Sequence, residues 1–175
     1  MILKFKLICL ALICFTIHSQ AQEQETIMIE WPKQYNWEVL SNNESDQMHR
    51  MEIVPKNETG ENWTILGQMM SIKGAHNISM EKAKELMYKQ IKMNAPGAII
   101  STLQKDEDLQ LPWILFKIEC PKFEDNNNPE SQLWYIKQGL NALYINFVAI
   151  KKASLDDVFI DRWGQVFIGS KLVKL

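Results

Sequence analysis

The chain has 175 residues, of which 46% are hydrophobic and 23% are charged, with 7 Gly, 6 Pro and 3 Cys. This composition excludes a collagen-like, coiled-coil or low-complexity chain, and it also excludes a fold built on a disulfide framework. The formal net charge is −2, which does not favour the phosphate backbone of a nucleic acid as a partner. The sequence therefore predicts a globular protein with no nucleic-acid partner.

The amino terminus has the pattern of a secretory signal. Lys4 and Lys6 form a basic start, residues 7–17 are mostly apolar, and Ser19-Gln20-Ala21 places small residues where signal peptidase cleaves. The apolar run is too short to cross a bilayer, which takes roughly 20 residues. We expect residues 1–21 to be a cleaved signal peptide, the location to be periplasmic or secreted, and a stable membrane anchor to be absent.

Cleavage would change the charge and the cysteine count. Two of the 19 basic residues lie in the signal and none of the acidic ones do, so 17 basic residues would remain against 21 acidic ones. Cys120 would be the one remaining cysteine, so no intramolecular disulfide could form. We expect residues 22–30 to be a flexible polar leader and residues 31–175 to be a single domain that relies on its hydrophobic core.

Alternating apolar residues predict strands along most of the chain. The segment Glu61 to Lys73 fits a helical face as well as a strand face, and its Gly, Ile and Thr content favours a strand. In Trp113 to Cys120, one apolar face includes Phe116 and Cys120, and both faces of Gln132 to Gln138 are partly apolar. The other expected strands are Trp37 to Leu40, Met48 to Val54, Ala98 to Leu103, and Ala142 to Ile150.

Two helices are expected from fourfold apolar spacing. The first spans Ser79 to Asn94, with Ser79 as its cap, and its apolar stripe is Ala83, Met87 and Ile91 flanked by Met80 and Leu86. The second spans about Leu155 to Ser170, with Ser154 and Asp157 as a capping box and a stripe of Leu155, Phe159, Trp163, Val166 and Phe167. The order of elements predicts the α+β class, with an antiparallel β-sheet of about six strands packed with two main helices.

No catalytic or cofactor-binding constellation is evident. A nucleophilic pair would need Cys120 with His49 or His76, and the apolar strand around Cys120 favours a buried structural thiol. Two distant histidines and one cysteine do not have the spacing of a zinc site. Motifs that bind phosphate and the hydrolase elbow G-x-S-x-G are absent. The sequence thus predicts no catalytic residues, no metal and no cofactor.

Two groups of residues are candidates for a binding site. Glu52, Glu58 and Glu61 flank an element made of a proline, a turn and a tryptophan, and paired carboxylates can perform acid–base chemistry when their pKa values differ. Solvated or turn-capping carboxylates are the alternative explanation. The aromatic residues of the strands could line a groove, although core packing also explains them; they are Trp63, Trp113, Trp134, Tyr135 and Tyr144.

Two stretches resemble a family of small exported bacterial α+β proteins of uncharacterised function. The first is the Pro-turn-Trp motif Glu52-Ile53-Val54-Pro55 followed by Glu58 and Trp63-Thr64. The second includes Cys120-Pro121 and the Glu130 to Tyr144 segment. The resemblance spans about residues 48–170 and implies that the motif begins a long strand. The order of elements also resembles the PsbP-like sandwich, which implies a fold and no particular function.

Three functional hypotheses follow. The first is an exported, non-enzymatic binding or interaction protein whose partner is an unknown protein or small ligand of the cell envelope, with Glu52, Glu58, Glu61, Trp63, Trp134 and Tyr144 as its candidate binding residues. The second is an envelope hydrolase that uses the acidic residues. The third is a small-molecule carrier with an aromatic pocket near Trp63 and Trp134.

Overall fold

The computed structural model describes residues 25–108, 110–123 and 128–174; the expected signal peptide lies outside them. The described strands are β1 (Glu25–Met28), β2 (Trp37–Glu44), β3 (Met48–Pro55), β4 (Ile65–Lys73), β5 (Ile99–Asp106), β6 (Trp113–Cys120), β7 (Glu130–Gln138), β8 (Ala142–Ile150) and β9 (Lys171–Lys174). The helices are the short 3₁₀ helix η1 (Lys33–Tyr35), α1 (Met80–Lys92) and α2 (Asp157–Ile168).

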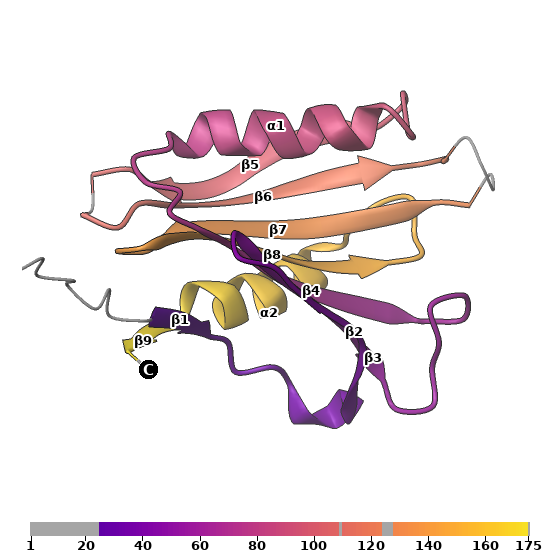
Figure 1. Ribbon diagram of the computed structural model, residues 1–175. Coiled ribbons are helices and arrows are strands. Elements are labelled where there is room, and N and C mark those ends of the chain that lie inside the picture. Colours follow the sequence, from indigo (N-terminus) through magenta and orange to yellow (C-terminus); the bar gives the residue numbers. More distant parts are fainter. Residues whose placement is uncertain (1–24, 109, 124–127, 175) are drawn as a thin grey trace, which may run out of the picture.

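Seven strands form one antiparallel sheet in the order β2-β3-β4-β8-β7-β6-β5. Helix α1 covers one face of this sheet and α2 the other, and β1 and β9 form a separate antiparallel ribbon on the side of α2 (Figure 1). The predicted α+β class and antiparallel sheet are confirmed. The expected number of about six strands is too low, because the described residues contain nine strands in two sheets.

The segment that fitted both a helix and a strand is a strand. Residues Ile65–Lys73 form β4, which pairs with β3 on one side and β8 on the other. The side chains of Leu66, Met70 and Ile72 pack on the side of α1, as expected for one face of a strand. Pairing on both edges explains the outcome, because a strand between two partners satisfies its backbone hydrogen bonds without a helix.

Both faces of the sheet carry a hydrophobic core. The α1 core contains Phe116, Cys120 and Trp134 together with Met80 and Ala83 of α1. The α2 core contains residues that alternate with these along the strands, including Leu133, Tyr135 and Val148, together with Trp163 and Phe167 of α2. Both faces of the expected strand Gln132 to Gln138 were predicted to be partly apolar, and in β7 every residue of this range except Lys137 is buried.

The helix caps agree with the sequence at α1 and differ at α2. Ser79 accepts a hydrogen bond from the backbone N–H of Lys82 at 3.2 Å, as expected of a cap. Leu86, expected at the edge of the apolar stripe, is 52% exposed instead. At α2 the cap is Asp156, which accepts from the N–H of Phe159 at 2.8 Å. Ser154 therefore does not cap this helix, which begins at Asp157.

An aromatic cluster anchors the chain between β1 and β2 to α2. The ring of Trp31 lies 5.6 Å from that of Trp163 and 5.4 Å from that of Trp37, measured between centroids. A Cβ atom at Gly67 in β4 would lie only 2.5 Å from a ring carbon of Trp31 and 2.9 Å from Ile53. Only glycine therefore lets Trp31 approach the sheet so closely.

The strand β1 lies within residues 22–30, where a leader was expected. Its register with β9 places Glu25 opposite Lys174. The carboxylate of Glu25 accepts from the backbone N–H of Asn141 at 2.7 Å, and its carbonyl accepts from the hydroxyl of Tyr144 at 2.9 Å. A side chain at Gly139 would collide with the Glu25 carboxylate at 2.3 Å, so this glycine is needed for the contact.

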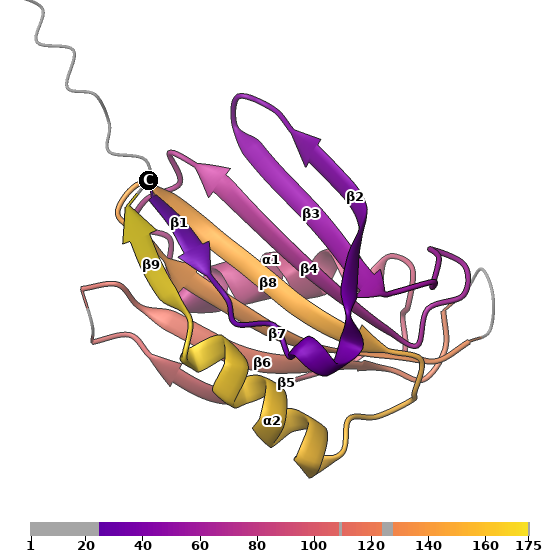
Figure 2. The same ribbon diagram turned by 90° about the horizontal axis from the view of Figure 1, so that it is seen from below.

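The helices do not cover the sheet evenly. Helix α1 packs on β6 and β7 and α2 packs on β7, whereas β2 and β3 extend beyond both helices (Figures 1 and 2). All nine residues of β8 are buried, but none of the eight residues of β2 is. We call β6, β7 and β8 the covered half of the sheet and β2, β3 and β4 the open half.

Candidate binding groove

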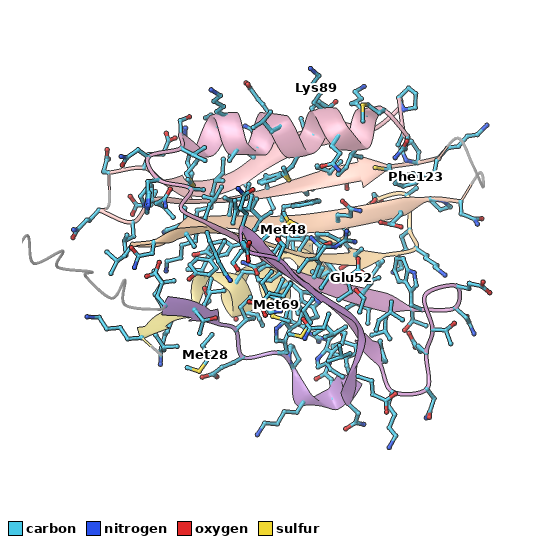
Figure 3. All side chains as sticks on the ribbon, viewed as in Figure 1. Met28, Met48, Glu52, Met69, Lys89 and Phe123 are labelled. Atoms are coloured by element: carbon cyan, nitrogen blue, oxygen red, sulfur yellow. The ribbon has the colours of Figure 1, made fainter. Side chains whose placement is uncertain are left out.

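A groove of about 380 Å³ lies where the open half of the sheet meets the edge of α1. We call it the α1 groove. One wall comes from the second half of α1, through Met87, Gln90 and Ile91, and from Asn94 just after the helix. Its floor is the sheet, through Gln68, Met70, Gln132, Trp134 and Phe147, and its ends carry Arg50, Phe123 and Glu130. In Figure 3, Phe123 lies beside the end of α1 and Lys89 points away from the sheet.

One row of side chains crosses the sheet under the α1 groove. Directly opposite residues on neighbouring strands give the order Ser41, Glu52, Gln68, Phe147, Trp134 and Phe116. The three rings form a ladder, with centroids 4.5 Å apart for Trp134 and Phe147 and 6.0 Å apart for Phe116 and Trp134. The row is therefore aromatic in the covered half and polar in the open half, and the change takes place inside the groove.

Gln68 lies where this row changes from polar to aromatic side chains, between Glu52 and Phe147. Its residue is only 6% exposed, and no hydrogen bond joins its side chain to any other residue that the structure describes. Its amide atoms are not among the fully buried side-chain atoms that lack a partner, so this amide meets the solvent that fills the groove. Gln68 thus offers an unused donor and an unused acceptor to whatever occupies the groove.

A relay of hydrogen bonds organises the acidic end of the groove. The indole N–H of Trp134 donates to Oε1 of Gln132 at 2.8 Å, and Nε2 of Gln132 donates to Oε1 of Glu130 at 2.6 Å. Burial raises the pKa of Glu130 above its ordinary value, against the opposing effects of the Gln132 hydrogen bond and the charge of Lys151. The relay fixes the Trp134 ring and leaves a desolvated carboxyl group at this end.

The opposite end of the groove is polar and more exposed. Arg50 lines it and pairs with the carboxylate of Glu52, which also accepts from the hydroxyl of Ser41 at 2.8 Å. Glu52 lies directly opposite Gln68 on the neighbouring strand. Because both Glu52 oxygens have protein partners, this carboxylate holds Arg50 in place at the rim (Glu52 is labelled in Figure 3).

The remaining acidic candidates lie in the connection between β3 and β4. The carboxylate of Glu58 accepts from the N–H of Thr64 at 2.6 Å and from its hydroxyl at 2.7 Å, so it closes the turn. Glu61 is exposed, and its backbone carbonyl accepts from Lys151. Neither residue lines the α1 groove.

Of the three aromatic candidates, one lines the α1 groove and two do not. Trp134 lines the groove, but Trp63 is 8% exposed, belongs to the α1 core and has the Lys151 ammonium 4.7 Å from its ring centroid. Tyr144 is buried against β1, and burial raises the pKa of its hydroxyl. Of the six candidate residues, only Trp134 lines the groove, and Glu52 borders it through its ion pair with Arg50.

Sequence reasoning missed Gln68 and the wall formed by α1. The available signal was a polar residue between Leu66 and Met70 on an otherwise apolar strand face. A helix residue such as Met87 is assigned to the core by its spacing alone, although it lies at the border between core and groove.

Cys120 has the structural role that its strand predicts. The thiol is free and buried, and burial, with a further contribution from the charge of Glu130, raises its pKa to about 11. A thiol with this pKa is not ionised near neutral pH and is a poor nucleophile. Among the residues described, no group of three or more His, Cys, Asp or Glu side chains could hold a metal, and no helix is long and apolar enough to span a membrane.

Comparison with known proteins adds no assignment. No protein-family model matches the sequence, and no curated protein matches it either. The functional argument therefore rests on the geometry of the chain itself.

Proposed function

We propose that the chain is an exported, non-enzymatic binding protein of the cell envelope, and that the α1 groove holds its ligand. The groove combines an aromatic floor with a few fixed polar groups, which is the usual composition of a small-molecule site. This arrangement favours a ligand with a flat apolar body and at least one hydrogen-bonding group. The layering of helix, sheet and helix supports a PsbP-like sandwich as the fold, which we likewise propose.

The unpartnered side chain of Gln68 is the observation that carries this proposal. A residue that only filled the core would be expected to be apolar at this position, because its row neighbour is Phe147. A ligand that enters the groove would replace the water at the amide of Gln68 with its own hydrogen-bonding groups. The fixed ring of Trp134 would contact the apolar body of the ligand without losing further side-chain entropy.

The hydrolase alternative has less support from the geometry. Both oxygens of Glu58 bind Thr64, and both oxygens of Glu52 bind Arg50 or Ser41. These carboxylates already have structural partners, and Glu61 lies outside the groove. If an envelope substrate were turned over by the protein and Glu52→Gln or Glu58→Gln abolished that turnover in a folded protein, the binding proposal would lose to the hydrolase.

A fluorescent probe tests the groove directly. N-phenyl-1-naphthylamine is neutral and has an aromatic body with one N–H donor, so it matches the floor and the amide of Gln68. We expect saturable binding of one probe per chain, with Met87→Glu abolishing it because a carboxylate would enter the groove wall. Gln68→Met should weaken binding about 2- to 10-fold, the value of one hydrogen bond.

The neighbouring helix residue provides the matched control. Leu86 is 52% exposed and lies outside the groove, so Leu86→Glu adds the same charge to α1 and should leave probe binding unchanged. Absence of saturable binding, or an equal loss in both variants, would refute the groove as the ligand site. Export is tested separately by sequencing the amino terminus of the protein from the envelope fraction, which should begin at Gln22.

A further inference from the structure

A second cluster of side chains lies on the opposite face of the open half of the sheet. Met51 on β3 is directly opposite Met69 on β4. Side chains of such a pair have Cβ atoms about 4.5–5.5 Å apart, so two flexible thioethers can meet at one point. Met69 packs against the α2 core, and Figure 3 shows it on the side of the sheet away from α1. Both methionines are half-buried, so small solutes can reach them.

His49 is held beside this pair in one tautomer. Its Nε2 lies 2.6 Å from Oδ1 of Asn42, the residue opposite Met51 on β2. An amide oxygen only accepts hydrogen bonds, so in the neutral imidazole Nε2 carries the proton and Nδ1 has the lone pair. No described residue contacts Nδ1 by a hydrogen bond. Histidine ligands of metals are typically fixed in this way, with one nitrogen donating to the protein and the other left for the metal.

Trp31 positions the sulfur of Met69. The indole N–H donates to Sδ at 3.3 Å, and the ring is itself fixed by Trp37 and Trp163. A thioether sulfur has two lone pairs, so one remains after this hydrogen bond.

Asn146 indicates that the same place suits a polar occupant. It lies opposite Met69 on β8, is fully buried, and neither its amide oxygen nor its amide nitrogen has a partner among the described residues. An apolar side chain would pack here at lower cost. The carboxylate of Glu44, opposite His49 on β2, forms an ion pair with Lys73.

We propose that Met51, Met69 and His49 bind a soft monovalent cation, Cu(I) or Ag(I). Thioethers and neutral imidazole are the donors that such ions prefer, whereas Ca²⁺ and Mg²⁺ require oxygen ligands. Two adjacent strands hold the three donors on one face, and the Trp31 N–H donates to the Met69 sulfur. This site is separate from the α1 groove and does not depend on the function proposed for it.

The first experiment uses the full chain with Cys9→Ser, Cys14→Ser and Cys120→Ser, so that no thiol competes for the ion. Cu(I) is supplied under reducing conditions in competition with the chromogenic chelator bicinchoninate, and Ag(I) as its nitrate. We expect one equivalent of Cu(I) to be withdrawn from the chelator, and the same amount of Zn²⁺ to leave the protein unchanged.

The methyl groups of methionine locate the ion without any further substitution. The protein has 9 Met, and labelling their methyl carbons gives one NMR signal for each. On addition of Ag(I), the signals of Met51 and Met69 should shift, and those of Met48 and Met70 should stay in place. Shifts spread over all methionines, or no withdrawal of Cu(I), would overturn the proposal.

Leucine substitutions supply matched controls along the same two strands. Met51→Leu and Met69→Leu should each lower Cu(I) affinity at least tenfold, and His49→Gln should lower it as well. Met48→Leu and Met70→Leu remove a thioether from the other face of β3 and β4 and should leave the affinity unchanged. Equal losses in both pairs would show that no specific site exists.

Discussion

The covered and open halves of the sheet differ in what completes their faces. In the covered half, each strand contributes side chains to both hydrophobic cores, one on each face of the sheet. Strand β8 is buried along its whole length. In the open half, β2 leaves Val39 60% exposed and β3 leaves Met48 38% exposed. The covered half is thus a finished core, whereas the open half carries free faces beside that core. Both proposed sites lie in or beside the open half, where side chains still have donor or acceptor atoms without a protein partner.

The strongest test of this comparison is the same substitution in each half. Leu133 is fully buried in the α2 core, so Leu133→Ala should cost about 2–5 kcal/mol of unfolding free energy. Leu40 on β2 is 37% exposed, and Leu40→Ala should change stability by less than about 0.5 kcal/mol. Urea unfolding at a fixed pH measures both, and similar losses would contradict the division into two halves.

The second test concerns the contact that joins the open half to α2. Gly67→Ala would place a Cβ atom 2.5 Å from Trp31 and 2.9 Å from Ile53, and such overpacking costs about 1–3 kcal/mol. In a Trp31→Ala background the same change should cost much less, because its main obstacle is gone. Gly60→Ala, whose nearest new contact is 3.7 Å from Leu40, is the control and should be close to neutral.

The third test asks how firmly α2 covers the sheet. Asp156→Ala removes the hydrogen bond to the N–H of Phe159 and should cost about 1 kcal/mol. Ser154→Ala should be neutral, since Ser154 does not cap the helix. A larger loss with Ser154→Ala, measured by thermal or urea unfolding, would mean that the helix begins earlier than described.

The smallest expected effect depends on pH and concerns Glu130, at the acidic end of the α1 groove. Burial raises the pKa of Glu130 above the ordinary carboxyl value of 4.5. The favourable contribution of the protonated Glu130 side chain to folding stability is therefore complete below pH 4.5. It is lost as the pH rises through the raised pKa, because the folded protein must then hold a buried anion. Glu130→Gln stays neutral, so its stability should increase relative to the original protein between about pH 4 and pH 7. Unfolding curves at both pH values would show the opposite trend if Glu130 were stabilised as an anion.

The strands of the covered half were predictable because apolar residues at alternating positions of the local sequence indicate buried strands. The strands Trp113–Cys120 and Ala142–Ile150 have the predicted boundaries. The ribbon of β1 and β9 was not expected, because each strand has four residues and their pairing joins distant parts of the chain. Trp31 likewise gave no local signal of its contact with Gly67, which depends on tertiary packing.

The candidate site was predictable only in part, for a similar reason. Trp134 was a candidate because aromatic residues are frequent at binding sites, and it does line the α1 groove. Gln68 was missed because one polar residue in a strand usually faces solvent, and its burial depends on β8 and α1 packing beside it. Glu58 had the expected residue type but serves the turn at Thr64, which no spacing rule distinguishes from a site.

The ribbon of β1 and β9 also determines how the fold responds to a mechanical load. Glu25, which starts β1, is opposite Lys174, which ends β9. The two residues on which a pulling force would act therefore lie at the same end of the ribbon. A force that pulled residues 25 and 174 apart would act on one pair of residues at a time, as in unzipping. The ribbon and the contacts of Glu25 with Asn141 and Tyr144 would therefore open at low force, before the strand pairing of the seven-stranded sheet broke.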